Sequence, residues 1–160
     1  MKAVIIPENN RKDYVNRLVY EYAKQMYIYK EFDSEELSLK QSKVDVFDRY
    51  YNDINNHFIY RFISDHEEIG SLWLRLINNK VHIFNVEIYK KFRNKRYSYS
   101  IMRHIDQFSR KKHIKEIFLY VFNCNYIARQ LYLSSGYKEI EQIKMYESKE
   151  YTRVLMSKEL

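Results

Sequence analysis

A run of basic residues separates a stretch of alternating hydrophobic residues from a helical pattern. The run holds Lys90, Lys91, Arg93, Lys95 and Arg96. A helix that begins near Ser98 would leave its first backbone N–H groups unpaired and would carry a partial positive charge there. Phosphate groups bind at such helix ends, and nearby Lys and Arg side chains add attraction. The segment therefore predicts a phosphate site, with an ordinary strand-to-helix loop as the alternative.

A second segment, residues 125–137, combines a helix cap, a phenol and a glycine. Asn125 is suited to cap a short helix, and Gly136 follows its predicted end, where a left-handed residue is favoured. Tyr132 falls on the hydrophobic face of that helix. Taken alone, this pattern indicates only a capped helix with an aromatic residue in the core.

Together the two segments resemble the GCN5-related acetyltransferase (GNAT) superfamily. The later helix of that family follows the pattern N-x-x-A-x-x-L-Y-x-x-x-G-F/Y. The residues that match it are Asn125, Ala128, Leu131, Tyr132, Gly136 and Tyr137. The family's phosphate loop follows Q/R-x-x-G-x-G/A at the start of a helix. Arg93 fits its first position, whereas Arg96 and Ser98 stand where glycine or alanine is usual. Residues 68–73 are similar to the third strand of the family, so the resemblance covers nearly the whole chain.

The resemblance implies an α/β (α+β) fold, with a mixed, mostly antiparallel central sheet flanked by helices on both faces. It implies a single domain over residues 1–160. It further implies that acetyl-CoA is the cosubstrate, and that an amine acceptor attacks the thioester directly, without an acyl-enzyme. Neither nucleic acid nor a membrane is an expected partner, and a homodimer is an assembly that the family allows.

The resemblance also implies roles for specific residues. The cofactor-binding set comprises Val86, Ile88, Arg93, Asn94, Lys95, Arg96, Tyr97, Ser98 and Asn125. The backbone around Val86 and Ile88 would hold the pantetheine arm, and the N–H groups of residues 94–98 would hold the pyrophosphate. Asn125 would orient the cofactor near its sulfur, and Tyr132 would protonate the departing thiolate. Glu87 is the candidate base, with an exposed strand carboxylate as the alternative.

The hydrophobic periodicity predicts the elements that position these residues. The expected strands span residues 2–6, 57–64, 69–77, 80–89, 116–122, 137–146 and 152–158. A first helix is expected to be capped by Asn10, and a second to run from a capping box at Asp33 and Glu36 to Tyr51. Further helices are expected over 98–112 and from Asn125. Residues 116–122 lack alternation, which predicts burial on both faces of the sheet.

Composition narrows the possible functions further. The 160 residues include one cysteine, which excludes an intramolecular disulfide and a cysteine-based zinc site. The histidines show no metal-ligand spacing, and no metal is expected. Neither a signal peptide nor a membrane span is evident, so a cytoplasmic location is expected. The net charge of +7 and the 17 tyrosines leave a nucleic-acid-binding protein as one alternative.

The departure at Arg96 leaves another alternative, an acetyl-CoA-binding module without transfer activity. The sequence leaves the acceptor open as well. Aromatic and acidic residues in the segment 27–38 suit a cationic amine, although any junction between helices could carry them.

Overall fold

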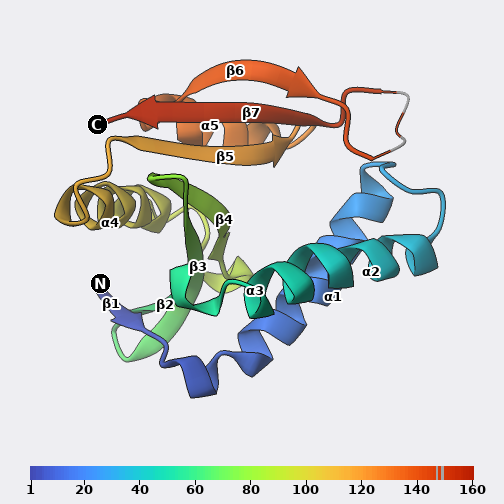
Figure 1. The fold of residues 1–160 in the computed structure, drawn as a ribbon. Coiled ribbons are helices and arrows are strands. Elements are labelled where there is room, and N and C mark those ends of the chain that lie inside the picture. Colours follow the sequence, from blue (N-terminus) through green and yellow to red (C-terminus); the bar gives the residue numbers. More distant parts are fainter. Residues whose placement is uncertain (147, 149) are drawn as a thin grey trace.

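A sheet of seven strands, in the order β1-β2-β3-β4-β5-β7-β6, organises the chain. The computed structural model describes residues 1–146, 148 and 150–160. The strands are β1 (Lys2–Ile5), β2 (His57–Ser64), β3 (Glu67–Ile77), β4 (Lys80–Ile88), β5 (Glu116–Phe122), β6 (Lys138–Ile143) and β7 (Arg153–Glu159). β4 and β5 pair in parallel and the other neighbours pair antiparallel. The predicted mixed, mostly antiparallel sheet is confirmed (Figure 1).

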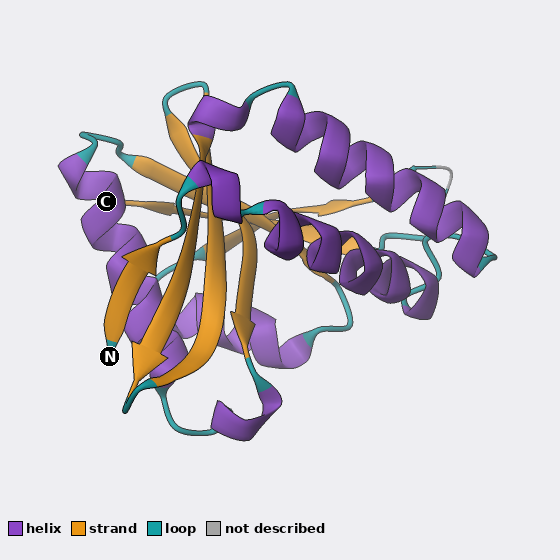
Figure 2. Ribbon diagram, turned by 90° about the horizontal axis from the view of Figure 1, so that it is seen from below, coloured by secondary structure: helices purple, strands orange, loops and turns teal. Residues whose placement is uncertain are grey.

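Helices cover both faces of this sheet (Figure 2). They are α1 (Lys12–Ile28), α2 (Glu35–Lys43), α3 (Arg49–Tyr51), α4 (Tyr97–Lys111) and α5 (Tyr126–Ser134). Shorter turns of π or 3-10 type span Glu8–Asn10, Val44–Asp48, Ile54–Asn56 and Lys90–Phe92. Within residues 1–146, 148 and 150–160, no helix is both long enough and apolar enough to cross a membrane.

Each face of the sheet has its own hydrophobic core. On one face, side chains of α4 and α5 such as Ile105 and Tyr132 pack with Leu72, Leu119 and Met156 of the strands. On the other face, side chains of α1 and of the π turn pack with the strands. Members of this smaller cluster include Val15, Val19, Val46, Ile59 and Trp73. Different helices therefore cover the two faces of the sheet.

The two central strands diverge, and this divergence creates the main irregularity of the sheet. In the part of the chain that the structure describes, β4 and β5 pair only at Val81 with Ile117 and at His82 with Phe118. A register shift opposite Trp73 and Leu74 marks a bulge in β4, and bulges bend a strand. Figure 1 shows β4 and β5 running apart beyond the paired residues. The backbone edge of β4 from residue 84 to 88 is thus left unpaired by β5.

Gly70 allows β3 to approach β4 closely at this point. A Cβ atom at Gly70 would lie 2.1 Å from the backbone oxygen of Glu87, which is far inside contact distance. The early glycine of β3 therefore fixes the path of the strand that carries Glu87.

Three predictions about the first helices are wrong in detail. Asn10 lies in a 3-10 turn, and α1 begins after Arg11. The Arg11 side chain does not cap the helix but bonds the backbone oxygens of Ile6 and His57 at 2.9 and 3.0 Å. The second helix is capped by Ser34, whose hydroxyl accepts from the N–H of Leu37 at 3.2 Å, so Asp33 and Glu36 form no capping box. The same helix is interrupted by the π turn Val44–Asp48 before it reaches Tyr51.

The prediction that residues 116–122 are buried on both faces is also wrong. Ile117, Leu119 and Val121 are buried on the α4–α5 face, whereas Tyr120 on the other face is 41% exposed. Burial therefore alternates from residue 116 to residue 121, and the pattern was hidden because Phe118, Tyr120 and Phe122 on the outer side are aromatic. Because β4 has diverged, the outer face of β5 stays partly open.

Candidate active site

Glu87 lies on β4 and points toward α1. In register it stands opposite Ser71 of β3, and its carboxylate accepts a hydrogen bond from Nη2 of Arg17 at 3.2 Å. Burial raises the pKa of Glu87, the nearby carboxylate of Glu21 raises it further, and the Arg17 guanidinium acts in the opposite direction. A carboxylate with a raised pKa accepts a proton more readily, which suits a general base.

Arg17 connects Glu87 to a wider polar network between α1 and the ends of β3 and β4. Its Nη1 donates to the hydroxyl of Tyr89 at 3.2 Å. The hydroxyls of Tyr89 and Tyr14 both donate to one oxygen of Glu68, at 2.6 and 2.8 Å. The network fixes the orientation of Arg17 and therefore that of Glu87. Sequence reasoning treated α1 only as a packing helix and missed Arg17.

The predicted phosphate loop curls tightly between β4 and α4. Phe92 is only 9% exposed and anchors the loop in the core. Nε of Arg93 donates to the backbone oxygen of Ile88 at 3.0 Å. Asn94 and Arg96 have φ angles of 64° and 59°, in the left-handed region that favours glycine. Arg96 thus adopts a conformation that favours glycine, at a position where the family pattern has glycine.

The N-terminus of α4 is open to an anion. Among the described residues, no side chain caps this helix, and its N-cap residue is Arg96. The helix therefore begins with backbone N–H groups that its own side chains do not satisfy, next to Arg93, Lys95 and Arg96. Lys91 is engaged elsewhere, since its Nζ lies 2.5 Å from Glu67. Tyr97 packs against the core of the α4–α5 face, so its side chain supports the helix.

The start of α5 differs from that of α4. The side-chain oxygen of Asn125 accepts from the N–H of Ala128 at 3.2 Å, which confirms the predicted cap. Nη1 of Arg129 bonds the backbone and side-chain oxygens of Asn123 at 2.8 and 3.0 Å and tightens the same turn. The structure gives Asn125 a local structural role, and its contact with a cofactor stays a prediction.

Tyr132 is held at the buried end of α5 by the turn that follows it. Gly136 has a φ angle of 89°, as the predicted left-handed residue requires. The N–H groups of Gly136 and Tyr137 bond the oxygens of Leu133 and Tyr132 at 3.1 and 3.0 Å, which is a Schellman motif. Burial raises the pKa of Tyr132 to about 12, so its phenol keeps its proton at neutral pH.

Glu87 and Tyr132 belong to opposite faces of the sheet. Tyr132, Val86 and Ile88 lie in the hydrophobic cluster of the α4–α5 face, while Glu87 bonds Arg17 on the α1 face. This arrangement follows from strand alternation along β4. The roles predicted for Glu87 and Tyr132 therefore require a substrate that reaches side chains from both faces of the sheet.

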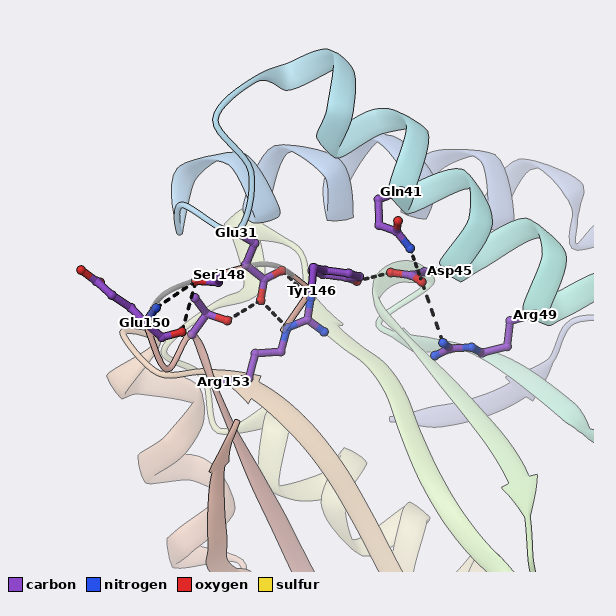
Figure 3. Close-up of polar contacts among 9 residues, drawn as sticks. Glu31, Gln41, Asp45, Arg49, Tyr146, Ser148, Glu150 and Arg153 are labelled. Carbon is purple, nitrogen blue, oxygen red and sulfur yellow. Dashed lines mark hydrogen bonds and ion pairs between the residues drawn. The ribbon is translucent and has the colours of Figure 1, made fainter. Parts of the chain in front are cut away.

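A buried ion pair joins the segment after α1 to β7, beside the end of β5 (Figure 3). Glu31, which follows α1, accepts from Nε and Nη2 of Arg153 at 2.7 and 2.6 Å and from Oγ1 of Thr152 at 2.9 Å. The Arg153 guanidinium lies over the rings of Tyr22 and Phe122, at 5.1 and 4.8 Å from their centroids. These contacts tie the α1–α2 connection to the start of β7, and no local pattern in the sequence predicts them.

Two aromatic residues of segment 27–38 pack near this ion pair. Tyr29 packs on Phe122 with ring centroids 4.5 Å apart, and Phe32 packs on Tyr146 at 4.9 Å. The hydroxyl of Tyr146 donates to Asp45 of the π turn (Figure 3). Tyr29 and Phe32 are thus engaged in packing, although the sequence suggested that they could line an entrance for the acceptor.

The single cysteine, Cys124, is exposed. In the ranges 1–146, 148 and 150–160, no group of three or more His, Cys, Asp or Glu side chains is arranged to hold a metal ion.

Comparison with known proteins places this geometry in a family. The sequence profile of the Acetyltransferase (GNAT) family matches residues 18–137. The uncharacterized N-acetyltransferase YycN of Bacillus subtilis (strain 168) is 26% identical over 112 residues, which cover 68% of this chain and 72% of YycN.

Two solved structures share the fold. The structure of YycN from Bacillus subtilis, a putative acetyltransferase by its description, has a TM-score of 0.76 at 20% identity, covering 93% of this chain and 100% of that one. The PaiA N-acetyltransferase of Thermoplasma acidophilum, in complex with coenzyme A, has a TM-score of 0.69 at 19% identity, and all of both chains is covered.

Proposed function

Because this chain belongs to the GNAT acetyltransferase family, we propose that it transfers the acetyl group of acetyl-CoA to an amine by direct attack. The observation that carries the proposal is the opening between β4 and β5, which has an uncapped helix N-terminus beside it. The PaiA protein, which shares the fold, was crystallised with coenzyme A.

The residues around the opening fit the parts of acetyl-CoA. The first N–H groups of α4 and the side chains of Arg93, Lys95 and Arg96 suit the pyrophosphate, because helix N-termini and guanidinium groups both favour phosphate. The edge of β4 that β5 leaves unpaired offers the backbone groups of Val86 and the N–H of Ile88 to the amides of the pantetheine arm, since the oxygen of Ile88 already accepts from Arg93. The oxygen of Asn125 is occupied by the α5 cap, so a contact with the cofactor would use its amide nitrogen.

The proposed reaction needs two proton transfers. The amine nitrogen bonds to the carbonyl carbon of the thioester, and the carbon–sulfur bond breaks. Glu87 takes the proton that the amine loses, and its raised pKa favours this step. Tyr132 donates its phenol proton to the departing sulfur and regains a proton afterwards. The acceptor approaches from the α1 face, and acetyl-CoA lies toward α4 and α5.

A combined binding and turnover experiment tests this proposal. A ligand at a hundredfold excess over its Kd adds about 2.7 kcal/mol to the free energy of unfolding. We expect acetyl-CoA to raise the melting temperature, and free thiol to be released when a panel of amines is added. A melting shift without thiol release would indicate a binding module. A shift with an oligonucleotide but none with acetyl-CoA would indicate a nucleic-acid-binding protein.

A further inference from the structure

Arg17 of α1 forms an ion pair with the candidate base Glu87. Its Nη2 donates to Oε2 of Glu87 at 3.2 Å. Over residues 1–146, 148 and 150–160, this is the one ion pair that Glu87 makes. The proposed transfer needs Glu87 as a carboxylate, because a protonated carboxyl group cannot take a proton from the amine. A cation at this distance therefore acts on the group that the reaction depends on.

Several contacts hold the Arg17 guanidinium in place. Nη1 donates to the hydroxyl of Tyr89 at 3.2 Å. The central carbon of the guanidinium lies over the rings of Tyr14 and Tyr89, 5.2 Å from each centroid, and such rings attract a cation. Oε1 of Glu68 accepts from both tyrosine hydroxyls, so the two rings are fixed in turn. Arg17 is thus held in one orientation, although its side chain is 40% exposed.

The groups around Glu87 act on its ionisation in both directions. Burial raises the pKa of Glu87, and the carboxylate of Glu21, one turn along α1 from Arg17, raises it further. Arg17, Arg93 of the loop after β4 and the hydroxyl of Ser71 on β3 lower the pKa of Glu87. Loss of Arg17 would leave burial and Glu21 less opposed, so Glu87 would keep its proton up to a higher pH.

We propose that Arg17 is a positioning residue for the acetyl transfer: it holds Glu87 as a carboxylate in the free protein and fixes the direction in which that carboxylate meets the amine. The proposal rests on the proposed function, in which Glu87 is the base. Arg17 itself takes up no proton and acts through Glu87.

The acid limb of the pH profile tests the charge of Arg17. The pH dependence of kcat/KM reports the ionisation of the free enzyme, in which Arg17 and Glu87 are in contact. Arg17→Met removes the charge, and the acid limb should move to higher pH by about one unit, the low end of the range for an adjacent cation because Arg17 is partly exposed. Below both limbs the variant should be about tenfold slower than the wild type. Its acetyl-CoA Kd should stay within about threefold.

Three further variants separate charge from geometry. Arg17→Lys keeps the charge but lacks the planar fork that bonds Glu87 and Tyr89 together, so its acid limb should stay within about half a unit while the plateau of kcat falls by about threefold or more. Glu21→Gln removes a repelling carboxylate and should move the limb to lower pH. Arg110→Met removes one positive charge from an exposed position in the last turn of α4 and should leave the limb in place.

A carbon NMR titration follows the Glu87 carboxylate without any acceptor. Its signal is identified by its loss in Glu87→Gln. We expect the midpoint of the Glu87 titration to rise by about one pH unit in Arg17→Met and to stay constant in Arg110→Met. Melting temperatures of all variants confirm that the fold is kept.

The outcomes separate this inference from the proposed function. If the Glu87 midpoint and the acid limb are unchanged in Arg17→Met, or if Arg17→Lys keeps the wild-type plateau, the positioning proposal is wrong while acetyl transfer stands. If Arg17→Met does not fold, an unchanged plateau in Arg17→Lys or an unchanged limb in Glu21→Gln overturns the proposal. If the midpoint shifts but no amine in a broad panel releases thiol from acetyl-CoA, the proposed function itself fails.

Discussion

Two helices begin on the two sides of the opening between β4 and β5, and their N-termini are built differently. At α5, the side chain of Asn125 accepts from the N–H of Ala128 at 3.2 Å, so a residue of the turn itself satisfies this N–H group. At α4, within the described part of the chain, no side chain performs this task, and Arg96 enters the helix in a left-handed conformation with a φ angle of 59°.

The difference separates a structural helix end from a binding one. A capped N-terminus has used part of its hydrogen-bonding capacity, while an uncapped one keeps N–H groups and a partial positive charge for a ligand. In our account α4 binds the phosphates of acetyl-CoA, and α5 carries a rigidly held phenol. In the sequence each helix start follows a strand through a short polar turn, and the two differ in that Asn125 offers a cap to one while a basic run precedes the other.

The largest expected effect concerns the chemical role of α5. Tyr132→Phe keeps the ring in the core and removes only the phenol proton. If Tyr132 protonates the leaving thiolate, kcat should fall by roughly 10²-fold or more, because this is the usual range for the loss of a positioned acid. Acetyl-CoA affinity should change little. Steady-state kinetics and a melting curve of the free variant measure the two effects.

A stable Tyr132→Phe protein with full activity would contradict the chemical role given to α5. The helix would then serve only in packing, and water or the acceptor would protonate the thiolate.

A somewhat smaller effect is expected for Glu87→Gln. Burial raises the pKa of Glu87, so the carboxylate is protonated, and inactive as a base, at a higher pH than an ordinary Glu. In the wild type, kcat/KM should therefore fall as pH falls through this raised pKa. The variant should lose about 10- to 10²-fold in kcat at neutral pH, and the acid limb assigned to Glu87 should disappear. An unchanged acid limb in Glu87→Gln would assign it to another group.

The cap of α5 should matter for stability more than for binding. Asn125→Ala leaves the N–H of Ala128 without its partner, and the loss of such a cap costs about 1 kcal/mol of the free energy of unfolding. We expect the acetyl-CoA Kd to stay within about threefold of the wild type. Denaturant unfolding and calorimetric titration measure the pair. A normal free energy of unfolding combined with a much weaker Kd would instead support the cofactor role predicted for Asn125.

The smallest effect is expected at Arg96. Its left-handed conformation costs a non-glycine residue about 1 kcal/mol, but glycine gains flexibility in the unfolded chain, so the two changes largely offset each other. Arg96→Gly should therefore change the free energy of unfolding by less than about 1 kcal/mol, and the acetyl-CoA affinity by less than about tenfold. A hundredfold loss of affinity would identify the Arg96 side chain as a phosphate ligand in its own right.

The elements around the opening were predictable from sequence because their signals are local. The cap at Asn125 and the left-handed Gly136 both lie within a few residues of the groups that they organise. Helix starts were misplaced by a residue or two at Asn10 and Asp33. At the second helix a neighbouring hydroxyl, that of Ser34, makes the capping bond, and the first helix begins after Arg11 without a side-chain cap among the described residues.

Contacts across the sheet were not predictable in this way. Arg17 meets Glu87 across 70 positions of the sequence, and Glu31 meets Arg153 across 122. No periodicity along one element reports such pairs, and each of these residues has an unremarkable local setting. The base candidate was found through the family pattern, but the arginine that orients it was not.

The central claim, that α4 binds the phosphates of acetyl-CoA, is tested most directly at Ser98. Calorimetric titration with acetyl-CoA should compare the wild type, Ser98→Ala and Ser98→Asp. Aspartate in the first turn favours the helix by about 0.3–1 kcal/mol, so Ser98→Asp should melt at the same temperature as the wild type or higher. Its carboxylate would face the phosphates, and acetyl-CoA affinity should fall by about a hundredfold or more, while Ser98→Ala binds normally. Equal affinity in all of these proteins would contradict the account and place the cofactor elsewhere.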